Sequence, residues 1–197
     1  MDQLLVALDV EHGARALQLV EQLGDTVGGV KIGSRLFTLE GPELVKRIAS
    51  TGVRVFLDLK FHDIPNTVAQ AVEAATLTGA WMINVHASGG VPMMQAAAKA
   101  AVDTARMARK PKPLVIGVTV LTSMDEPTLH DVGVNRPLMH HVVELARMAQ
   151  RAGLDGVVAS PLPPPAPPCS GCRGTSGRGT RACRARRCAS RARGPRA

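Results

Sequence analysis

The sequence predicts an α/β fold of the (β/α)8 TIM-barrel type, incomplete here, with about six βα units. Apolar runs typical of strands alternate with helical segments of ten or more residues, a pattern that favours parallel βα units. Most of the predicted strands end in a polar or charged residue, at the edge where such barrels collect their catalytic groups. The rival fold, a doubly wound open sheet, predicts a glycine-rich phosphate loop after the first strand, and the residues Asp9-Val10-Glu11-His12 form no such loop.

The predicted strands are short apolar runs, the first of them expected to be buried. They cover residues 4–9, 27–33, 53–60, 80–86, 114–120 and 154–160. The polar residues at or near their ends are Asp9, Lys31, Lys60, His86, Thr119 and Ser160.

The predicted helices fill the intervals between these strands, at residues 11–23, 40–50, 65–78, 91–109 and 137–152. In the first of them, apolar side chains recur with helical spacing, at Ala16, Leu19, Val20 and Leu23. Gly52 is a stop signal for the second helix. Pro65 suits the first turn of the third, where its missing N–H has no partner to lose.

Length and composition favour one globular domain with a sizeable core, since the chain has 197 residues of which 45% are hydrophobic. No apolar run approaches the roughly 18 residues of a membrane span. The start, Met1-Asp2-Gln3, does not resemble a signal peptide. We therefore expect a cytoplasmic protein.

The net charge of +8 has its source in residues 162–197, which hold nine arginines, no lysine and no acidic residue. After Leu162 there is no Leu, Ile, Val, Met, Phe or Trp, so this segment cannot bury enough apolar area to offset chain entropy. We therefore predict a partial barrel domain at residues 1–161 and a disordered basic tail, rich in Arg, Pro and Cys, at residues 162–197. Its residues are those of GC-rich codons, and one hypothesis is a shifted reading frame.

All four cysteines lie in this tail, as Cys169-x-x-Cys172 and Cys183-x4-Cys188. The spacing loosely resembles a zinc site. Without apolar residues to fold around a metal, we expect none there. The arginines could bind polyanions through phosphates, but a charged segment without aromatic residues is more typical of a solvated tail.

The strongest motif is Asp58-x-Lys60-x-x-Asp63-Ile64-Pro65-Asn66-Thr67, at the end of the third strand. Strand alternation puts Val53, Val55, Leu57 and Leu59 on one face and Phe56, Asp58 and Lys60 on the other. Opposite charges at the end of a buried strand carry a desolvation cost unless they are paired or used. The motif therefore predicts a functional site.

This motif, with Leu8-Asp9 and Val30-Lys31-Ile32-Gly33, closely resembles the orotidine 5'-phosphate decarboxylase family. The resemblance extends over residues 4–161 and includes segments 84–90, 118–124 and 152–158. Sugar-phosphate relatives in the same superfamily share the DxKxxD pattern and use magnesium, but His62 and Ile64-Pro65-Asn66-Thr67 favour the decarboxylase.

The resemblance implies a carbon–carbon lyase of de novo pyrimidine biosynthesis that converts orotidine 5'-phosphate to UMP and CO2 without cofactor or metal. It implies that Lys60 protonates C6 and that Asp58 holds Lys60 near the departing carboxylate. Lys31 is expected to pair with Asp58 and contact the ribose, and Asp9 to bind ribose hydroxyls.

The family's pattern also implies a homodimer, in which Asp63, Ile64 and Thr67 reach into the neighbouring subunit's site. Asp63 is thereby a fourth catalytic candidate, beside Lys60, Asp58 and Lys31. Thr122 and Ser123 match the family's pyrimidine-contacting position, although a Thr-Ser pair after a strand is more often an ordinary turn. His86 is expected to point into the barrel mouth by strand alternation. It can be a structural histidine or a residue of the site, and both interpretations stay open.

A full-length family member continues with two more strands, a phosphate-gripping loop that contains glutamine, and a Gly-Arg pair that binds the phosphate. Residues 162–197 match none of these. We therefore expect the first and sixth strands to be unpaired edges and the activity of this chain to be low. The alternative function is an inactive barrel fragment whose basic tail binds polyanions non-specifically.

Overall fold

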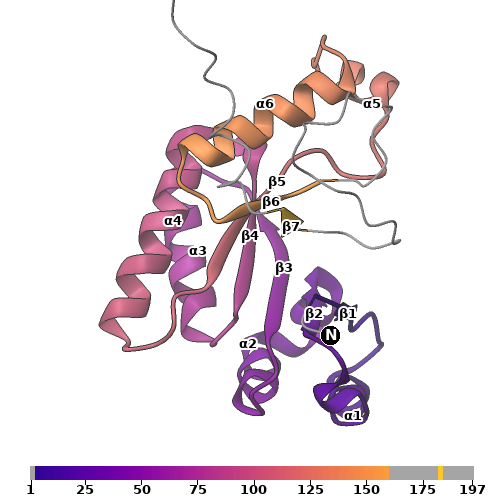
Figure 1. Cartoon of the computed structure of the whole chain (residues 1–197), viewed down its shortest axis with the longest axis vertical. Helices are drawn as coiled ribbons and strands as arrows, with labels where there is room; N and C mark the ends of the chain where they lie inside the picture. The colour runs from indigo at the N-terminus through magenta and orange to yellow at the C-terminus, as the bar shows by residue number, and fades with distance from the viewer. Residues whose placement is uncertain (1–2, 160–181, 184–197) are drawn as a thin grey trace, which may run out of the picture.

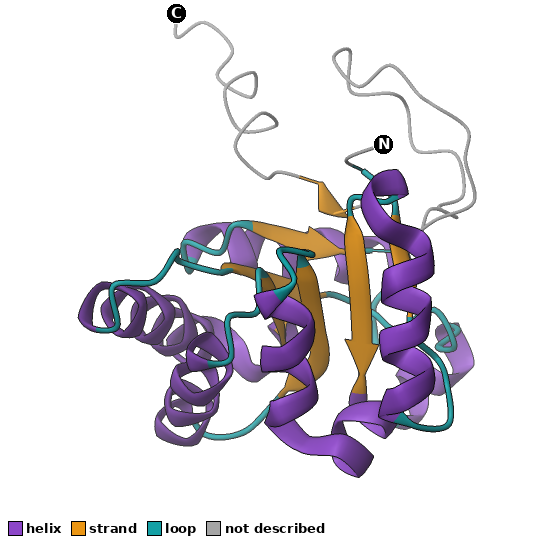
Figure 2. Cartoon of the chain, turned by 90° about the horizontal axis from the view of Figure 1, so that it is seen from below, coloured by secondary structure: helices purple, strands orange, loops and turns teal. Residues whose placement is uncertain are grey.

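The computed structural model of the chain describes residues 3–159 and 182–183. Its six parallel strands form a sheet that curls into a half-barrel, with helices alternating along the chain and packed around the strands (Figures 1 and 2). The strand order in the sheet follows the chain from β1 to β6. The predicted α/β fold of the TIM-barrel type is thus confirmed. No helix in the described part of the chain is long and apolar enough to cross a bilayer.

The strands are shorter than predicted, but the first residue of each strand lies within two residues of its predicted start. Their bounds are β1 (Leu5–Ala7), β2 (Gly29–Gly33), β3 (Val55–Phe61), β4 (Met82–His86), β5 (Leu114–Val118) and β6 (Gly156–Val158). All five pairs of neighbours among them are parallel. Their carboxyl ends therefore meet at one edge of the sheet.

The helices agree with the predictions except in two places. Their bounds are α1 (Gly13–Leu23), α2 (Ser34–Ser50), α3 (Pro65–Leu77), α4 (Gly90–Met107), α5 (Glu126–Asp131) and α6 (Leu138–Arg151). Short 3-10 turns lie at Gly24–Thr26 and Ala87–Gly89. Helix α2 begins six residues before the predicted start and is kinked at Gly41, which has φ of 67° and precedes Pro42. The short α5 was not predicted, and it begins where the Asp125 carboxylate accepts the N–H of Thr128 at 2.9 Å.

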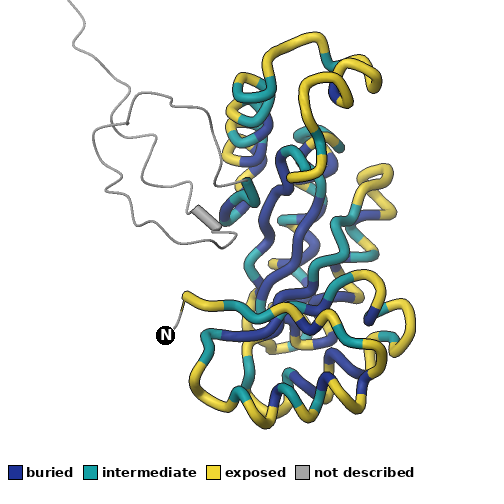
Figure 3. The backbone as a smooth tube through the Cα atoms, turned by 90° about the vertical axis from the view of Figure 1, so that its right-hand side faces the viewer, coloured by how far each residue is buried: buried dark blue, intermediate teal, exposed yellow. Residues whose placement is uncertain are grey.

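Buried apolar residues form two clusters on opposite faces of the sheet. Figure 3 shows that buried residues are concentrated along the strands. The larger layer lies between the strands and the helices and includes Val55 and Leu57 of β3. The smaller lies on the concave face of the sheet, where Phe56 packs with Met82 and Ile116. The predicted division of β3 into two faces is therefore confirmed from Val55 to Leu57, and the same alternation places Asp58 on the Phe56 face. It does not continue to Lys60, where the register with β4 shifts.

The two outermost parallel strands differ from their predictions. Strand β1 is half-buried rather than buried, because β2 is its only partner strand in the described part of the chain. The sixth strand was expected to be an unpaired edge, and this is wrong: β6 pairs antiparallel with β7 (Ala182–Cys183), a strand the sequence did not predict. The rest of the predicted tail, residues 162–181 and 184–197, lies outside the described residues, as do Ser160 and Pro161.

Candidate active site

Four charged side chains from the first three strands alternate in sign at the carboxyl edge of the sheet. We call Asp9, Lys31, Asp58 and Lys60 the charged array. Lys60 Nζ lies 2.6 Å from Asp58 Oδ1, and Lys31 Nζ lies 3.3 Å from Asp58 Oδ2. Asp9 Oδ1 lies 4.0 Å from Lys31 Nζ, so the order is carboxylate, ammonium, carboxylate, ammonium.

Asp58 is the most buried member of the array, with 13% of its side chain exposed against 77% for Asp9. Burial raises the pKa of Asp58, but hydrogen bonds from Lys60 and Asn84 and the charges of Lys60 and Lys31 outweigh this effect. The net result is a pKa below the ordinary value of 3.8. Asp58 is thus an ionised carboxylate at neutral pH, held between two cations.

Lys60 has an unusual backbone that the strand pattern does not reveal. Its φ is 53°, a left-handed value uncommon for a residue with a Cβ. Leu57 pairs with Ile83 of β4 while Phe61 pairs with Val85, so β3 carries two extra residues over this stretch. This bulge ends the simple alternation after Leu59 and changes the direction of the chain at Lys60.

Asn84 on β4 contacts the bulge and was missed as a site residue in the sequence. Its side chain is 1% exposed, donates through Nδ2 to Asp58 Oδ1 at 2.7 Å, and accepts the backbone N–H of Lys60 at 2.8 Å. A polar residue at an inward-facing position of the apolar run Met82-Ile83-Asn84-Val85 was the signal that could have identified it.

The charged array borders a cavity of about 310 Å³ at the carboxyl ends of β1, β2 and β3. Besides the array, the cavity is lined by Leu8, Val10, Gly33, Ser34, Arg35 and Leu36. It contains three cationic side chains, those of Lys31, Lys60 and Arg35. The excess of positive charge suits an anionic small molecule, and Arg35 is a second residue that the sequence reasoning missed.

Two histidines lie side by side next to the array. The rings of His62 and His86 are 5.4 Å apart between centroids and inclined at 41°. Burial lowers the pKa of His86, and the positive charges of His62 and Lys60 lower it further against an opposing effect of Asp58. His86 is therefore a neutral imidazole at physiological pH, beside a charged site.

Asp63, Ile64 and Thr67 are exposed, and among the described residues no hydrogen bond or ion pair joins them to the charged array. Asp63 Oδ1 accepts the N–H of Ile64 at 2.6 Å, directly before α3, and the Ile64 side chain is 65% exposed. Within the described residues, Asp63 forms no ion pair with Lys60. All three side chains are thus accessible from outside this chain.

Thr122 and Ser123 are exposed and form a turn after β5, where the N–H of Met124 bonds to the carbonyl of Leu121 at 3.0 Å. The structure does not bring them into hydrogen-bonding contact with the array among the described residues. Their predicted contact with a pyrimidine ring stays a prediction.

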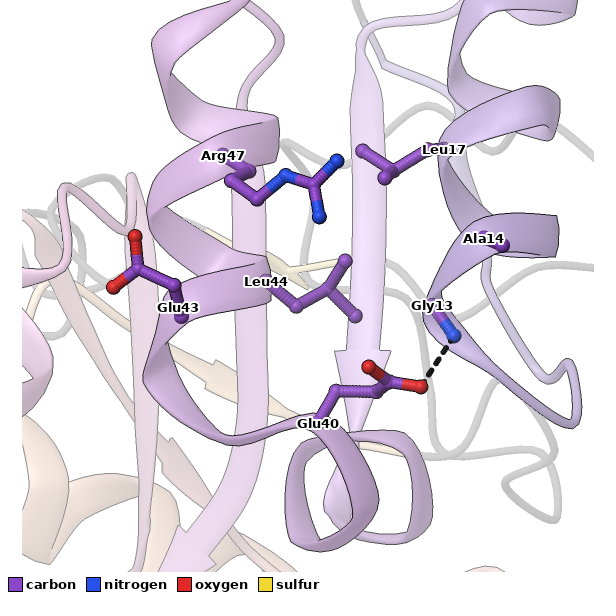
Figure 4. A pocket seen from close by; sticks show the side chains of 7 residues that line it. All are labelled: Gly13, Ala14, Leu17, Glu40, Glu43, Leu44 and Arg47. Atoms are coloured by element: carbon purple, nitrogen blue, oxygen red, sulfur yellow. Dashed lines mark hydrogen bonds between the residues drawn. The ribbon is translucent and has the colours of Figure 1, made fainter.

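A second cavity, of about 210 Å³, lies between α1 and α2 (Figure 4). Glu40 spans it, because its carboxylate accepts the Gly13 N–H at 2.6 Å, at the first residue of α1. Leu17, Leu44 and Arg47 point into the same space. The Glu40 carboxylate already occupies the positive end of the helix, so we read this contact as a structural link between α1 and α2.

The cysteine pattern considered for zinc cannot be placed, since Cys169, Cys172 and Cys188 lie outside the described residues. The residues described elsewhere contain no cluster of three metal-ligating side chains. The polyanion-binding alternative also depends on arginines outside the described ranges.

Comparisons with known proteins point to one family. The sequence model of the "Orotidine 5'-phosphate decarboxylase / HUMPS family" matches residues 2–170. The chain is similar to the orotidine 5'-phosphate decarboxylase of Shewanella sediminis, with 53% identity over 157 residues that cover 80% of this chain and 65% of the relative. It is also similar to that of Legionella pneumophila (strain Corby), with 51% identity over 158 residues, 80% of this chain and 67% of the relative.

A solved structure agrees in fold. The crystal structure of orotidine 5'-phosphate decarboxylase from Lactobacillus acidophilus superposes with a TM-score of 0.74 at 35% identity, and covers 81% of this chain and 71% of that one. The chain spans just under two thirds of the length of the Shewanella relative. Because the family model matches residues 2–170, this chain belongs to the orotidine 5'-phosphate decarboxylase / HUMPS family.

Proposed function

We propose that this chain is an orotidine 5'-phosphate decarboxylase that forms UMP and CO2 in pyrimidine biosynthesis. The observation that carries the proposal is the charged array, in which Asp58 lies between Lys31 and Lys60 beside a cavity. An ionised carboxylate next to the substrate carboxylate, with an ammonium group within reach of C6, is the arrangement this reaction requires.

The reaction breaks the bond between C6 and the carboxylate, and its electron pair stays on C6. Lys60 Nζ donates a proton to C6 as CO2 departs, and the resulting amine regains a proton from solvent. Asp58 holds Lys60 Nζ in place, at 2.6 Å from its own Oδ1, before the substrate reacts. The preorganised charges supply electrostatic stabilisation where no cofactor accepts the electrons.

The other predicted contacts complete the proposed site. Lys31 contacts the ribose while it is paired with Asp58. The exposed Asp9 carboxylate accepts hydrogen bonds from the hydroxyl groups of the ribose. Thr122 and Ser123 contact the pyrimidine. No metal or cofactor is assigned to the reaction.

The proposed active form is a cytoplasmic homodimer in which Asp63, Ile64 and Thr67 complete the partner's site. Their exposure and their position at the start of α3 support this assignment, since an exposed Asp63 can contact a neighbouring subunit. A mixture of Lys60→Ala and Asp63→Ala chains tests it. Random pairing should restore about a quarter of the activity through one intact site per mixed dimer; a mixture as inactive as its components would refute shared sites.

The proposed reaction is tested by purifying the full chain and following loss of orotidine 5'-phosphate by ultraviolet absorbance. Lys60→Ala should lower turnover by at least about a hundredfold, because it removes the general acid. Lys99→Ala is the matched control, because Lys99 is exposed on α4 and its ion pair among residues 3–159 is with Asp103. Retention of most activity in Lys60→Ala would overturn the proton-donor assignment.

Dialysis against EDTA separates the proposal from the magnesium-dependent sugar-phosphate chemistry of related barrels. The decarboxylase rate should be unchanged by chelation. A rate that disappears with EDTA and returns with Mg²⁺ would favour the chemistry of the sugar-phosphate relatives instead.

A further inference from the structure

We propose that Asn84 is a positioning residue of the active site, whose carboxamide fixes both the Asp58 carboxylate and the backbone of Lys60. The inference rests on the proposed function, since positioning affects catalysis only if the charged array acts on a substrate. Its geometric part concerns contacts within the chain and can be measured without any substrate.

The two ends of the Asn84 side chain make different hydrogen bonds. Nδ2 donates to Asp58 Oδ1 at 2.7 Å, and Oδ1 accepts the Lys60 N–H at 2.8 Å. A carboxylate only accepts and a backbone N–H only donates, so one orientation of the amide satisfies both neighbours. With 1% of its surface exposed, Asn84 exchanges neither bond for water.

The bulge in β3 explains why the Lys60 backbone needs a partner on β4. Between Leu57 and Phe61 the two strands lose their regular register, and Asn84 lies between the two β4 residues that remain paired, Ile83 and Val85. The Asn84 side chain supplies the acceptor for the partly buried Lys60 N–H in this gap. It thereby supports the left-handed conformation of Lys60, which is unfavourable for a residue with a Cβ.

The same carboxamide determines how the Asp58 carboxylate is turned. Asp58 Oδ1 receives Asn84 Nδ2 and Lys60 Nζ, which leaves Oδ2 facing Lys31 Nζ at 3.3 Å. Rotation of the carboxylate would break two of these contacts together. Asn84 therefore couples the backbone direction at Lys60 to the spacing between both lysines and the carboxylate.

Two substitutions in the full chain separate the two bonds. Asn84→Leu removes both with little change in volume, whereas Asn84→Asp keeps the shape and the acceptor and loses the donor. Thr76→Val is the matched control, because Thr76 is 2% exposed and its hydroxyl bonds to the Val72 carbonyl within α3, away from the array.

The readouts are the Asp58 carboxyl titration and the Lys60 Cα shift by NMR, together with kcat and KM for orotidine 5'-phosphate. Asn84→Leu should raise the pKa of Asp58, move the Lys60 shift away from left-handed values, and lower kcat about tenfold to a hundredfold with a smaller change in KM. Asn84→Asp should raise the pKa of Asp58 and alter the Lys60 shift less. Thr76→Val should change none of these values.

Failure of this inference is distinguishable from failure of the proposed function. An Asp58 titration and a Lys60 shift that stay unchanged in both Asn84 variants would overturn the positioning role, whatever the activity. Altered NMR values with unchanged kcat in an active chain would reduce Asn84 to a structural residue and also overturn it. Altered NMR values in a chain that does not decarboxylate would support the geometry and reject the proposed function. If Asn84→Leu does not fold, the isosteric Asn84→Asp decides.

Discussion

Lys60 combines a functional side chain with a strained backbone, since it is one of two non-glycine residues with positive φ in the described part of the chain. The other, Arg109, has φ of 54° just after α4 and is exposed. A left-handed conformation costs roughly 1–2 kcal/mol for a residue with a Cβ. Strain of this kind persists where surrounding contacts hold it, and here the holding contact is that of Asn84.

This strain predicts that Lys60→Gly is more stable than Lys60→Ala. Both remove the ammonium group, so they differ only in backbone preference. Glycine relieves the left-handed cost but loses about 0.4–1 kcal/mol through the entropy of the unfolded chain, which leaves an expected advantage of about 0.5–1 kcal/mol. Urea unfolding measures it, with Arg109→Gly and Arg109→Ala as a control pair. Equal stability of the two Lys60 variants would mean that the site is unstrained.

Asp58 gives the chain an acid-sensitive component of stability. Its folded-state pKa is below the ordinary value of 3.8, so the pairing stabilises the fold fully above that value and is lost as the pH falls through the folded-state pKa. Asp58→Asn should therefore flatten the decrease in unfolding free energy measured by urea titration at pH values below 3.8. A decrease as steep as that of the parent chain would contradict this assignment.

The ionic strength distinguishes the contribution of Asp58 to stability at acid pH from that of a second aspartate, Asp103. A hydrogen bond from Lys99 lowers the pKa of Asp103 on α4, whose side chain is 29% exposed. Asp103→Asn should therefore also flatten the loss of stability at acid pH when the ionic strength is low. High salt should remove the difference in pH dependence of the unfolding free energy between Asp103→Asn and the parent chain, because charges near the surface are screened. The difference for Asp58→Asn should persist, since the carboxylate is largely buried.

At the scale of elements, alternation and helical spacing predicted every strand from β1 to β6 and the positions of five helices. Local patterns could not predict three features. The bulge at Lys60 depends on pairing with β4, the burial of β1 depends on its neighbours, and the start of α2 lies before Gly41-Pro42, a pair that normally separates elements. The array residues were predictable because strand ends identify them; Asn84 was missed because a single amide inside a strand has no motif.

Two glycines have different roles, Gly41 at the kink in α2 and Gly29 at the start of β2, and this difference gives a prediction. Gly41 has φ of 67° and open space where a Cβ would stand, so Gly41→Ala should cost only the conformational penalty of about 1 kcal/mol. At Gly29, a Cβ would lie 2.5 Å from the Arg54 carbonyl oxygen, so Gly29→Ala must displace β3 from β2. We expect a cost of about 2–3 kcal/mol there. Urea unfolding compares them, and a larger loss at Gly41 would mean that the kink supports more of the fold than its local geometry indicates.

At the scale of the whole molecule, the described half-barrel has a well-packed outer layer and a small inner one. The outer layer between strands and helices holds most of the buried side chains, whereas the inner cluster centres on Phe56, Met82 and Ile116. The charged array lies at the open side of this arrangement. Its members on β2 and β3 are held by neighbouring strands, and Asp9 after the half-buried β1 is the least restrained.

This gradient predicts that the array would tighten if β1 gained a second neighbour. We expect a neighbour to be supplied by joining residues 1–159 to the third of the Shewanella sediminis decarboxylase that this chain does not cover, since the chain covers 65% of that relative and a closed barrel pairs its first strand on both sides. A paired β1 should bring Asp9, now 77% exposed and 4.0 Å from Lys31, into a fixed position. Misplacement of about 1 Å can cost a hundredfold in rate, and phosphate contacts expected from the added strands contribute about 1.5–3 kcal/mol each.

The chimaera should therefore exceed the 197-residue chain in kcat/KM for orotidine 5'-phosphate by at least about a hundredfold. Lys60→Ala in the chimaera is the control and should abolish the gain, whereas equal kcat/KM in the chimaera and the parent chain would show that the half-barrel already positions the array as well as a closed one.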